Sequence, residues 1–143
     1  MKTLFMKQWP ILFGLAVLVL TGALLGGCVF NKDKGGKVRD LDFSVIAEGD
    51  IPQELRQIIG EKKQSPFKLT FSDDQNLYIV TGYGRQASGG YSIAVNELYL
   101  TDNSIVLNTE LIGPGKGENV GTEASYPFIV IKTEMSELPV VFQ

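Results

Sequence analysis

The chain has 143 residues with a formal net charge of −3, one cysteine and no histidine. The missing histidine and the single cysteine exclude a Ser-His-Asp triad, an intrachain disulfide, and a zinc or haem site built from histidine or cysteine. All acidic residues follow the cysteine, Cys28, and this balance argues against nucleic acid and against a basic membrane-binding patch. We therefore expect no nucleic-acid partner, no cofactor and no metal.

An apolar run over residues 11–25 follows Lys2 and Lys7 near the start of the chain. A charged start and a short apolar run are typical of a secretory signal. As a helix this run would span about 22 Å, less than the hydrocarbon core of about 30 Å, so a permanent transmembrane helix is the weaker interpretation. Two small residues, Gly26 and Gly27, then suit the entry of an extended backbone into a peptidase site.

The apolar run ends in the sequence Leu-Gly-Gly-Cys, with its cysteine at position 28. This tetrad resembles the lipobox of bacterial lipoproteins. The resemblance implies that residues 1–27 are a signal peptide removed just before Cys28, which then carries a diacylglyceryl thioether. Its acyl chains would anchor the protein at the extracytoplasmic face of the cell membrane. The alternative is an uncleaved anchor helix with an incidental cysteine.

A charged, glycine-containing stretch follows the cysteine. Residues 28–40 show little apolar periodicity, which predicts a lipidated N-terminus with a flexible tether. Residues 41–143 are enough for one domain with a single core and too few for two. A first strand is predicted over 41–47, with alternate apolar residues from Phe43 to Ala47 on one face.

One amphipathic helix is predicted after this strand. Asp50 can cap it, and Pro52 suits its first turn because the missing N–H would be unpaired there. The helix should end at Gly60 or in the polar stretch that follows. Its apolar stripe consists of Ile51, Leu55, Ile58 and Ile59.

Alternating apolar residues then predict a series of strands. A hairpin is expected from 67–72 and 77–81 around a turn at 73–76. The apolar phase of the strand that begins at Tyr91 slips by one position near Asn96 and Glu97, which indicates a bulge.

The last part of the chain continues this strand pattern. A turn at 102–104 leads to a strand from Ile105, and a loop is expected over 113–125. Residues 128–132 are apolar on both faces, as in a central strand, and 140–142 form a short edge strand. The predicted fold is therefore α+β, with one amphipathic helix packed on a mainly antiparallel sheet of about five to six strands.

Glycine-rich loops and acidic pairs are the candidate sites of chemistry in this sequence. The sequence Gly-Tyr-Gly at 82–84 is not followed by the dinucleotide-binding pattern, because Ala87 stands where glycine is needed and a strand follows where a helix is needed. Asp73 and Asp74 suit a turn better than a metal site. A two-carboxylate glycosidase stays open on spacing alone, but we expect a protein that is not an enzyme.

Several short motifs are similar to one known family. They are the Gly-Tyr-Gly at 82–84, Ser-Gly-Gly-Tyr-Ser-Ile at 88–93, Ile-Gly-Pro at 112–114 and Ser-Tyr-Pro-Phe-Ile-Val-Ile-Lys at 125–132. With these motifs the stretch from 77 to 142 resembles the C-terminal domain of the protease-complex subunit PrcB family, which occurs in bacterial lipoproteins. The resemblance implies an accessory lipoprotein that binds and stabilises a surface protease assembly.

The leading hypothesis is a lipid-anchored, non-catalytic domain that binds a protein partner, with an extracellular protease as the candidate, through its glycine loops and nearby tyrosines. The alternative is a sensor that binds a small peptide or glycan between helix and sheet. The residues expected at the partner contact are Tyr83, Arg85, Ser88, Gly89, Gly90, Tyr91, Lys116 and Tyr126.

Overall fold

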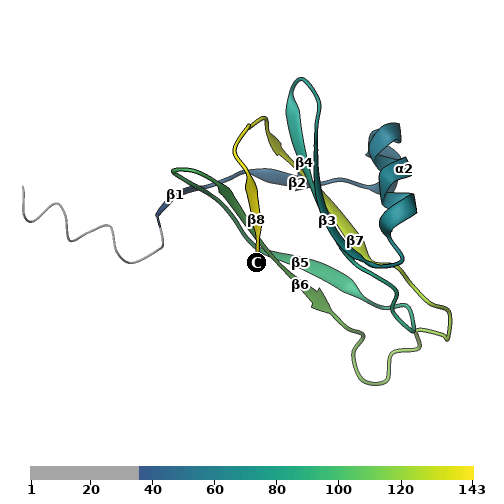
Figure 1. The fold of residues 1–143 in the computed structure, drawn as a ribbon. Coiled ribbons are helices and arrows are strands. Elements are labelled where there is room, and N and C mark those ends of the chain that lie inside the picture. Colours follow the sequence, from purple (N-terminus) through teal and green to yellow (C-terminus); the bar gives the residue numbers. More distant parts are fainter. Residues whose placement is uncertain (1–35) are drawn as a thin grey trace, which may run out of the picture. The chain divides into compact units, whose positions relative to one another are not determined.

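Two four-stranded sheets and one α-helix make up residues 36–143, the part of the chain that the computed structural model describes (Figure 1). The first sheet, called here the β5–β6 sheet, contains in spatial order β1 (Lys37–Asp40), β5 (Ser92–Thr101), β6 (Ile105–Ile112) and β8 (Val140–Phe142). The second, called here the β4–β7 sheet, contains in spatial order β2 (Phe43–Val45), β7 (Phe128–Glu134), β4 (Asn76–Tyr83) and β3 (Pro66–Ser72). Neighbouring strands are antiparallel except β6 and β8.

The predicted α+β class and the mainly antiparallel pairing are confirmed, but the prediction of one sheet with five to six strands is wrong. The reason lies in strands that are apolar on both faces. In β7, Ile129 and Ile131 face one core while Phe128 and Val130 face another. A single helix covers only one face of the β4–β7 sheet, so the other face is buried by a second sheet.

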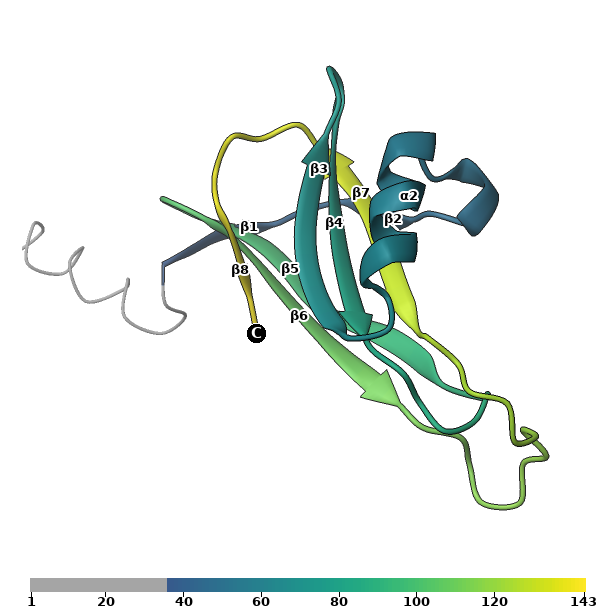
Figure 2. The same ribbon diagram turned by 45° about the vertical axis from the view of Figure 1, so that its right-hand side comes forward.

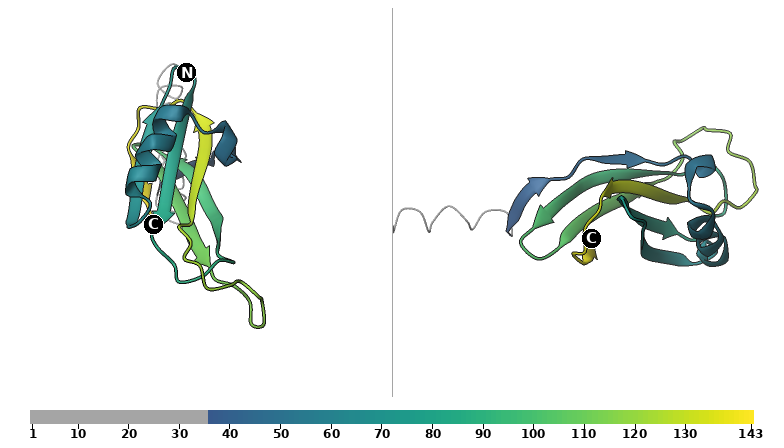
Figure 3. Two further views of the ribbon diagram at one scale, coloured as in Figure 1. Left: turned by 90° about the vertical axis from the view of Figure 1, so that its right-hand side faces the viewer. Right: turned by 90° about the horizontal axis from the view of Figure 1, so that it is seen from above.

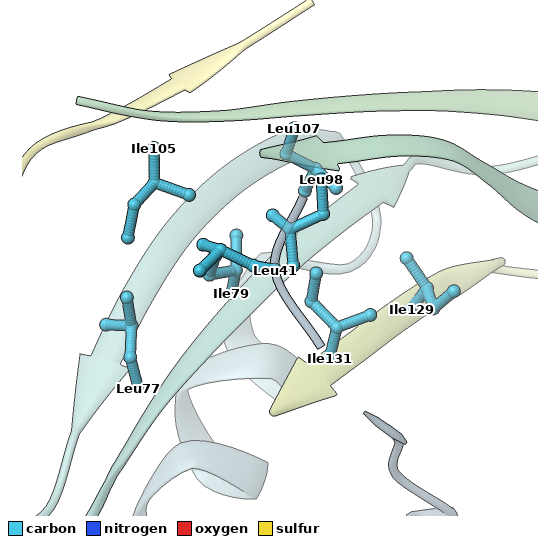
Figure 4. Close-up of a cluster of buried hydrophobic side chains, with 8 residues drawn as sticks. All are labelled: Leu41, Leu77, Ile79, Leu98, Ile105, Leu107, Ile129 and Ile131. Carbon is cyan, nitrogen blue, oxygen red and sulfur yellow. The ribbon is translucent and has the colours of Figure 1, made fainter. Parts of the chain in front are cut away.

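Two apolar cores separate the three layers. The inter-sheet core lies between the two sheets, where side chains from β4 and β7 point toward those of β5 and β6 (Figure 4). The helix core lies on the opposite face of the β4–β7 sheet, against α2 (Gln53–Lys62; Figure 2). The buried residues of the inter-sheet core are Leu41, Leu77, Ile79, Leu98, Ile105, Leu107, Ile129 and Ile131. Those of the helix core are Ile51, Leu55, Ile59, Tyr78, Val80 and Val130.

The predicted apolar stripe of the helix is confirmed, because Leu55 and Ile59 of α2 are buried in the helix core. The predicted cap is wrong. Asp50 ends a short 3-10 helix (Glu48–Asp50), and the N-cap position is Pro52, which forms no side-chain hydrogen bond. Arg56 instead donates a hydrogen bond of 3.0 Å to the carbonyl of Ile51. Within residues 36–143, no helix is long and apolar enough to cross a membrane.

The N-terminal boundaries differ from the prediction. The predicted signal peptide and Cys28 lie outside the described residues. The predicted tether is wrong over its last four residues, which form β1 and pair with β5. The predicted strand over 41–47 is reduced to β2, in which Phe43 and Val45 are exposed. The alternation fails because the chain crosses here from one sheet to the other, so that Leu41 enters the inter-sheet core and Ile46 the helix core.

Four other predicted features are confirmed. β3 and β4 form a hairpin whose turn is held by a hydrogen bond of 3.1 Å from the Asp73 N–H to the Asn76 carbonyl. The register of β5 against β6 shifts between Val95 and Glu97, where the apolar phase slips. β7 lies inside its sheet between β2 and β4, and β8 is an edge strand.

Candidate contact surface and inter-sheet cavity

The two loops that carry most of the predicted contact residues lie side by side at one end of the domain. They connect β4 to β5 (84–91) and β6 to β7 (113–127), and the second extends past the ends of the strands (Figure 3). Gln86 and Ser125 join them by two backbone hydrogen bonds of 2.8 and 3.0 Å. The Ser125 hydroxyl also donates to the Ser88 carbonyl at 2.6 Å. We call this paired structure the loop rim.

The two loops of the rim pack closely against each other at Gly90. Gly90 has a φ of +85°, and a Cβ placed there would lie 2.4 Å from a methyl carbon of Val120 and 2.9 Å from Cβ of Pro114. A side chain at this position would therefore require both backbone strain and movement of the second loop. Gly113 packs less tightly, since a Cβ placed there would lie 3.5 Å from the ring of Tyr91, an ordinary van der Waals contact. The loops consequently hold each other in a defined shape.

The structure brings the predicted contact residues together, with one exception. Arg85, Gly90 and Lys116 are exposed on the loop rim, and the remaining predicted residues are half-buried. The half-buried group consists of Tyr83, Ser88, Gly89, Tyr91 and Tyr126. Tyr83 is the exception, because its hydroxyl turns inward and forms a hydrogen bond of 2.7 Å with Thr109. The ammonium group of Lys63 lies 5.6 Å from the ring centroid of Tyr126, which links this ring to the end of α2.

An apolar groove continues the surface next to Tyr126. It has a volume of 340 Å³, and its lining is mostly apolar, with Glu48 as the one charged residue. The other lining residues are Val45, Ile46, Ile51, Tyr126 and residues 127–130. Val45, at the edge of the β4–β7 sheet, is 60% exposed. The sequence pattern did not indicate this groove, because Val45 falls on the apolar face of the strand predicted over 41–47.

Sequence analysis also missed a cavity between the two sheets. It has a volume of 490 Å³ and lies between β3 and β4 on one side and the ends of β6 and β8 on the other. Its lining residues are Pro66, Phe67, Lys68, Thr81, Gly82, Tyr83, Thr109, Phe142 and Gln143. The inter-sheet core ends here because the residues that follow Ile79 and Leu107 on the same strand faces are Thr81 and Thr109.

The hydroxyl of Thr81 is the most unusual polar group of this cavity. Thr81 is 3% exposed, and its hydroxyl forms no hydrogen bond with any described residue. Buried polar groups in proteins are nearly always hydrogen-bonded. The sequence does contain a signal, since Thr81 and Tyr83 break the apolar alternation that begins at Leu77 and Ile79.

The expected ligand space between helix and sheet is occupied by side chains of the helix core, including the fully buried Leu55 and Val80. The cavity lies on the other face of the β4–β7 sheet. Within the described part of the chain, no group of three or more Asp, Glu, His or Cys residues is arranged to hold a metal ion.

Asp73 has a structural role at the far end of the hairpin. Its carboxylate accepts hydrogen bonds of 2.9 and 2.7 Å from the N–H groups of Gln75 and Asn76. These two donors hold the pKa of the Asp73 carboxyl below its usual range. Burial, together with the nearby Asp73 carboxylate, raises the pKa of the Tyr78 phenol. Asp73 thus serves turn chemistry, as the sequence indicated.

The fold and the loops define a three-layer α+β domain with one braced loop rim. Comparison with known families identifies the segment more closely: residues 77–134 match the family model described as PrcB C-terminal. This match agrees with the family that the motifs indicated, and the matched segment spans β4 to β7 with both loops of the rim. The predicted resemblance extends to residue 142, whereas the match ends at Glu134, before β8. No curated protein and no solved structure shows a significant match to the chain.

Proposed function

We propose that this protein is a non-catalytic accessory protein that is lipid-anchored through Cys28 outside the cytoplasmic membrane and binds a protein partner through the loop rim. The partner is a component of an extracellular protease complex. The observation that carries the proposal is the bracing of the two loops, both of which lie within the segment matched to PrcB C-terminal.

A braced loop pair favours binding because little conformational freedom is lost on association. On the loop rim, Arg85 and Lys116 are exposed, and the same two loops carry the half-buried Tyr91 and Tyr126. Arginine and tyrosine are enriched among the residues that dominate protein interfaces. The groove beside Tyr126 adds apolar surface to the same region.

Site-specific photo-crosslinking tests this contact. A photoreactive phenylalanine analogue would replace Arg85 or Lys116 in the full chain in its native membrane, and Gln57 on the exposed face of α2 would serve as the matched control. We expect adducts with a protease-complex subunit from the two rim positions and none from Gln57. Equal adducts from all three positions, or adducts only from Gln57, would refute the rim as the contact surface.

Metabolic labelling with a radioactive fatty acid tests the lipid anchor separately. Wild type should incorporate label, and the Cys28→Ser variant should not, because the thioether needs the thiol. Equal label in the two proteins would refute the anchor while leaving the crosslinking result intact.

Activity measurements on the membrane-anchored protein test the proposed lack of catalysis. A panel of peptidase, esterase and glycosidase substrates should show no turnover above that of membranes without the protein. Turnover that scales with the amount of protein would refute a purely binding role.

A further inference from the structure

Strand β3 presents a free edge. It is the last strand of the β4–β7 sheet, and among residues 36–143 it pairs only with β4. The N–H of Tyr83 donates to the carbonyl of Pro127, so odd-numbered residues of β4 direct their backbone groups toward β7. Because these directions alternate along a strand, the even-numbered residues of β4 direct theirs toward β3.

The register then fixes which backbone groups of β3 face outward. Gly82, Val80 and Tyr78 lie opposite Phe67, Leu69 and Phe71, so these three residues of β3 use their N–H and C=O groups toward β4. The N–H and C=O groups of the even-numbered residues Lys68, Thr70 and Ser72 consequently point away from the sheet. Such a row of unpaired groups is a template for another strand.

The lysine side chain of this edge, Lys68, does not lie along the edge. A lysine on an edge strand discourages pairing when its charge lies along the edge. Here the ammonium group of Lys68 lies 5.6 Å from the ring centroid of Phe142 on β8. This contact draws the charge over the cavity and leaves the backbone edge of β3 open.

The inter-sheet cavity lies beside this edge. Lys68 and Thr81 are opposite each other in the register, and both line the cavity, so it opens on the face of β3 that carries the even-numbered side chains. Its volume of 490 Å³ lies within the range of about 300–1,000 Å³ that is typical of ligand sites. The buried Thr81 hydroxyl supplies a polar group without a partner among the described residues.

We propose that the free edge of β3 binds an extended peptide as an additional antiparallel strand, with a tyrosine side chain of the peptide in the inter-sheet cavity. Antiparallel pairing is the commoner arrangement and continues the β3–β4 hairpin. The apolar walls formed by Pro66 and Phe142 suit an aromatic ring, and the Thr81 hydroxyl suits its phenol after rotation about the Thr81 Cα–Cβ bond. This proposal goes beyond the proposed function, since it rests neither on the loop rim nor on the anchor.

The register predicts which N–H groups of the peptide are needed. In an antiparallel pair, residues directly opposite each other point their side chains to the same face. The tyrosine therefore lies opposite Lys68 and exchanges both backbone hydrogen bonds with it. The residues on either side of the tyrosine lie opposite Phe67 and Leu69, and their N–H groups point to solvent.

N-methylated peptides test this pattern. The probe is the fluorescein-labelled pentapeptide Thr-Val-Tyr-Val-Thr with an amidated C-terminus, titrated with the full chain in detergent micelles and followed by fluorescence anisotropy. We expect saturable binding that weakens about tenfold or more when the tyrosine nitrogen is methylated, because a paired N–H is lost. Methylation of both valine nitrogens should change the affinity less than threefold. Absence of binding to the parent peptide, equal loss in both methylated series, or loss in the valine series alone would overturn the proposal.

Two variants of the protein locate the site. Thr70→Pro removes an outward N–H without touching the β3–β4 ladder and should weaken binding of the pentapeptide about tenfold, whereas Thr70→Ala should not change it. Thr81→Val should abolish the preference for the tyrosine peptide over its phenylalanine analogue. Melting curves check that each variant is folded. If Thr70→Pro does not fold, the N-methylated peptides and the Thr81→Val variant test the proposal without it. Unchanged affinity in a folded Thr70→Pro variant, or an unchanged tyrosine preference in Thr81→Val, would overturn the proposal.

Discussion

Replacing Thr81 by valine should make the free protein more stable, in contrast to most substitutions of buried residues. The Thr81 hydroxyl is buried without a partner among the described residues, and the residue is only 3% exposed. An unsatisfied buried hydroxyl costs about 1–3 kcal/mol, and the valine methyl group that replaces it is favourable to bury by about 0.8 kcal/mol. Since part of the hydroxyl cost can be relieved by the cavity beside it, we expect a net gain of about 1–2 kcal/mol.

Thr133 offers a matched control, because it is also a threonine on a strand of the same sheet and is 4% exposed. Its hydroxyl donates a hydrogen bond of 2.8 Å to the carbonyl of Asp42. Thr133→Val should therefore lower stability by about 1–2 kcal/mol, since the carbonyl loses its donor.

Thermal unfolding of the full chain in detergent, followed by circular dichroism, measures both variants. A change of 1 kcal/mol corresponds to about 4 °C in Tm for a domain of this size. Thr81→Val should raise Tm by about 4–8 °C, and Thr133→Val should lower it by a similar amount. A fall in Tm for Thr81→Val that equals the fall for Thr133→Val would show that the Thr81 hydroxyl is bonded, and would refute the reasoning.

Three further predictions concern other parts of the fold. Gly90→Ala should lower the melting temperature more than Gly117→Ala, which also has a positive φ but has open space around its Cα; equal losses would contradict close packing of the loops. Asp73→Asn should lower stability at pH 7 more than Asp74→Asn, because the low pKa of the Asp73 carboxyl favours the folded state above pH 3.8. This advantage should shrink as the pH falls from 3.8 through the depressed pKa, and a difference between the two variants that stays constant from pH 7 to pH 2 in urea titrations would contradict it. Leu55→Ala should cost about 2–5 kcal/mol in the same titrations, since Leu55 is fully buried in the helix core; a loss below 1 kcal/mol would contradict its place there.

Local patterns predicted local structure well in this chain. The β3–β4 hairpin follows from strict alternation on both sides of a polar turn, and the bulge in β5 follows from the phase slip near Asn96. Both depend on side chains a few residues apart, which is the range over which strand periodicity carries information. The apolar stripe of α2 was predicted correctly for the same reason. The predicted cap at Asp50 is wrong, because Asp50 belongs to the preceding 3-10 helix.

The candidate site was predicted only in part. The motifs of the two glycine loops indicated the loop rim, and the structure brings these loops together through Gln86, Ser125 and the contact at Gly90. The inward turn of Tyr83 and the groove beside Val45 were not predicted. The inward turn of Tyr83 depends on its hydrogen bond with Thr109 of β6, and the groove depends on residues after Tyr126 that are far from Val45 in the sequence.

The sequence by itself determined the class of fold, most strand positions and the family of residues 77–134, because hydrophobic periodicity and short motifs are local. Only the tertiary structure decided that the strands divide into two sheets and that β3 has a free edge. It also decided that the inter-sheet core ends in a cavity whose lining includes Thr81 and Thr109. Sheet membership depends on which strands pair across long separations, and one alternating pattern fits several pairings equally well.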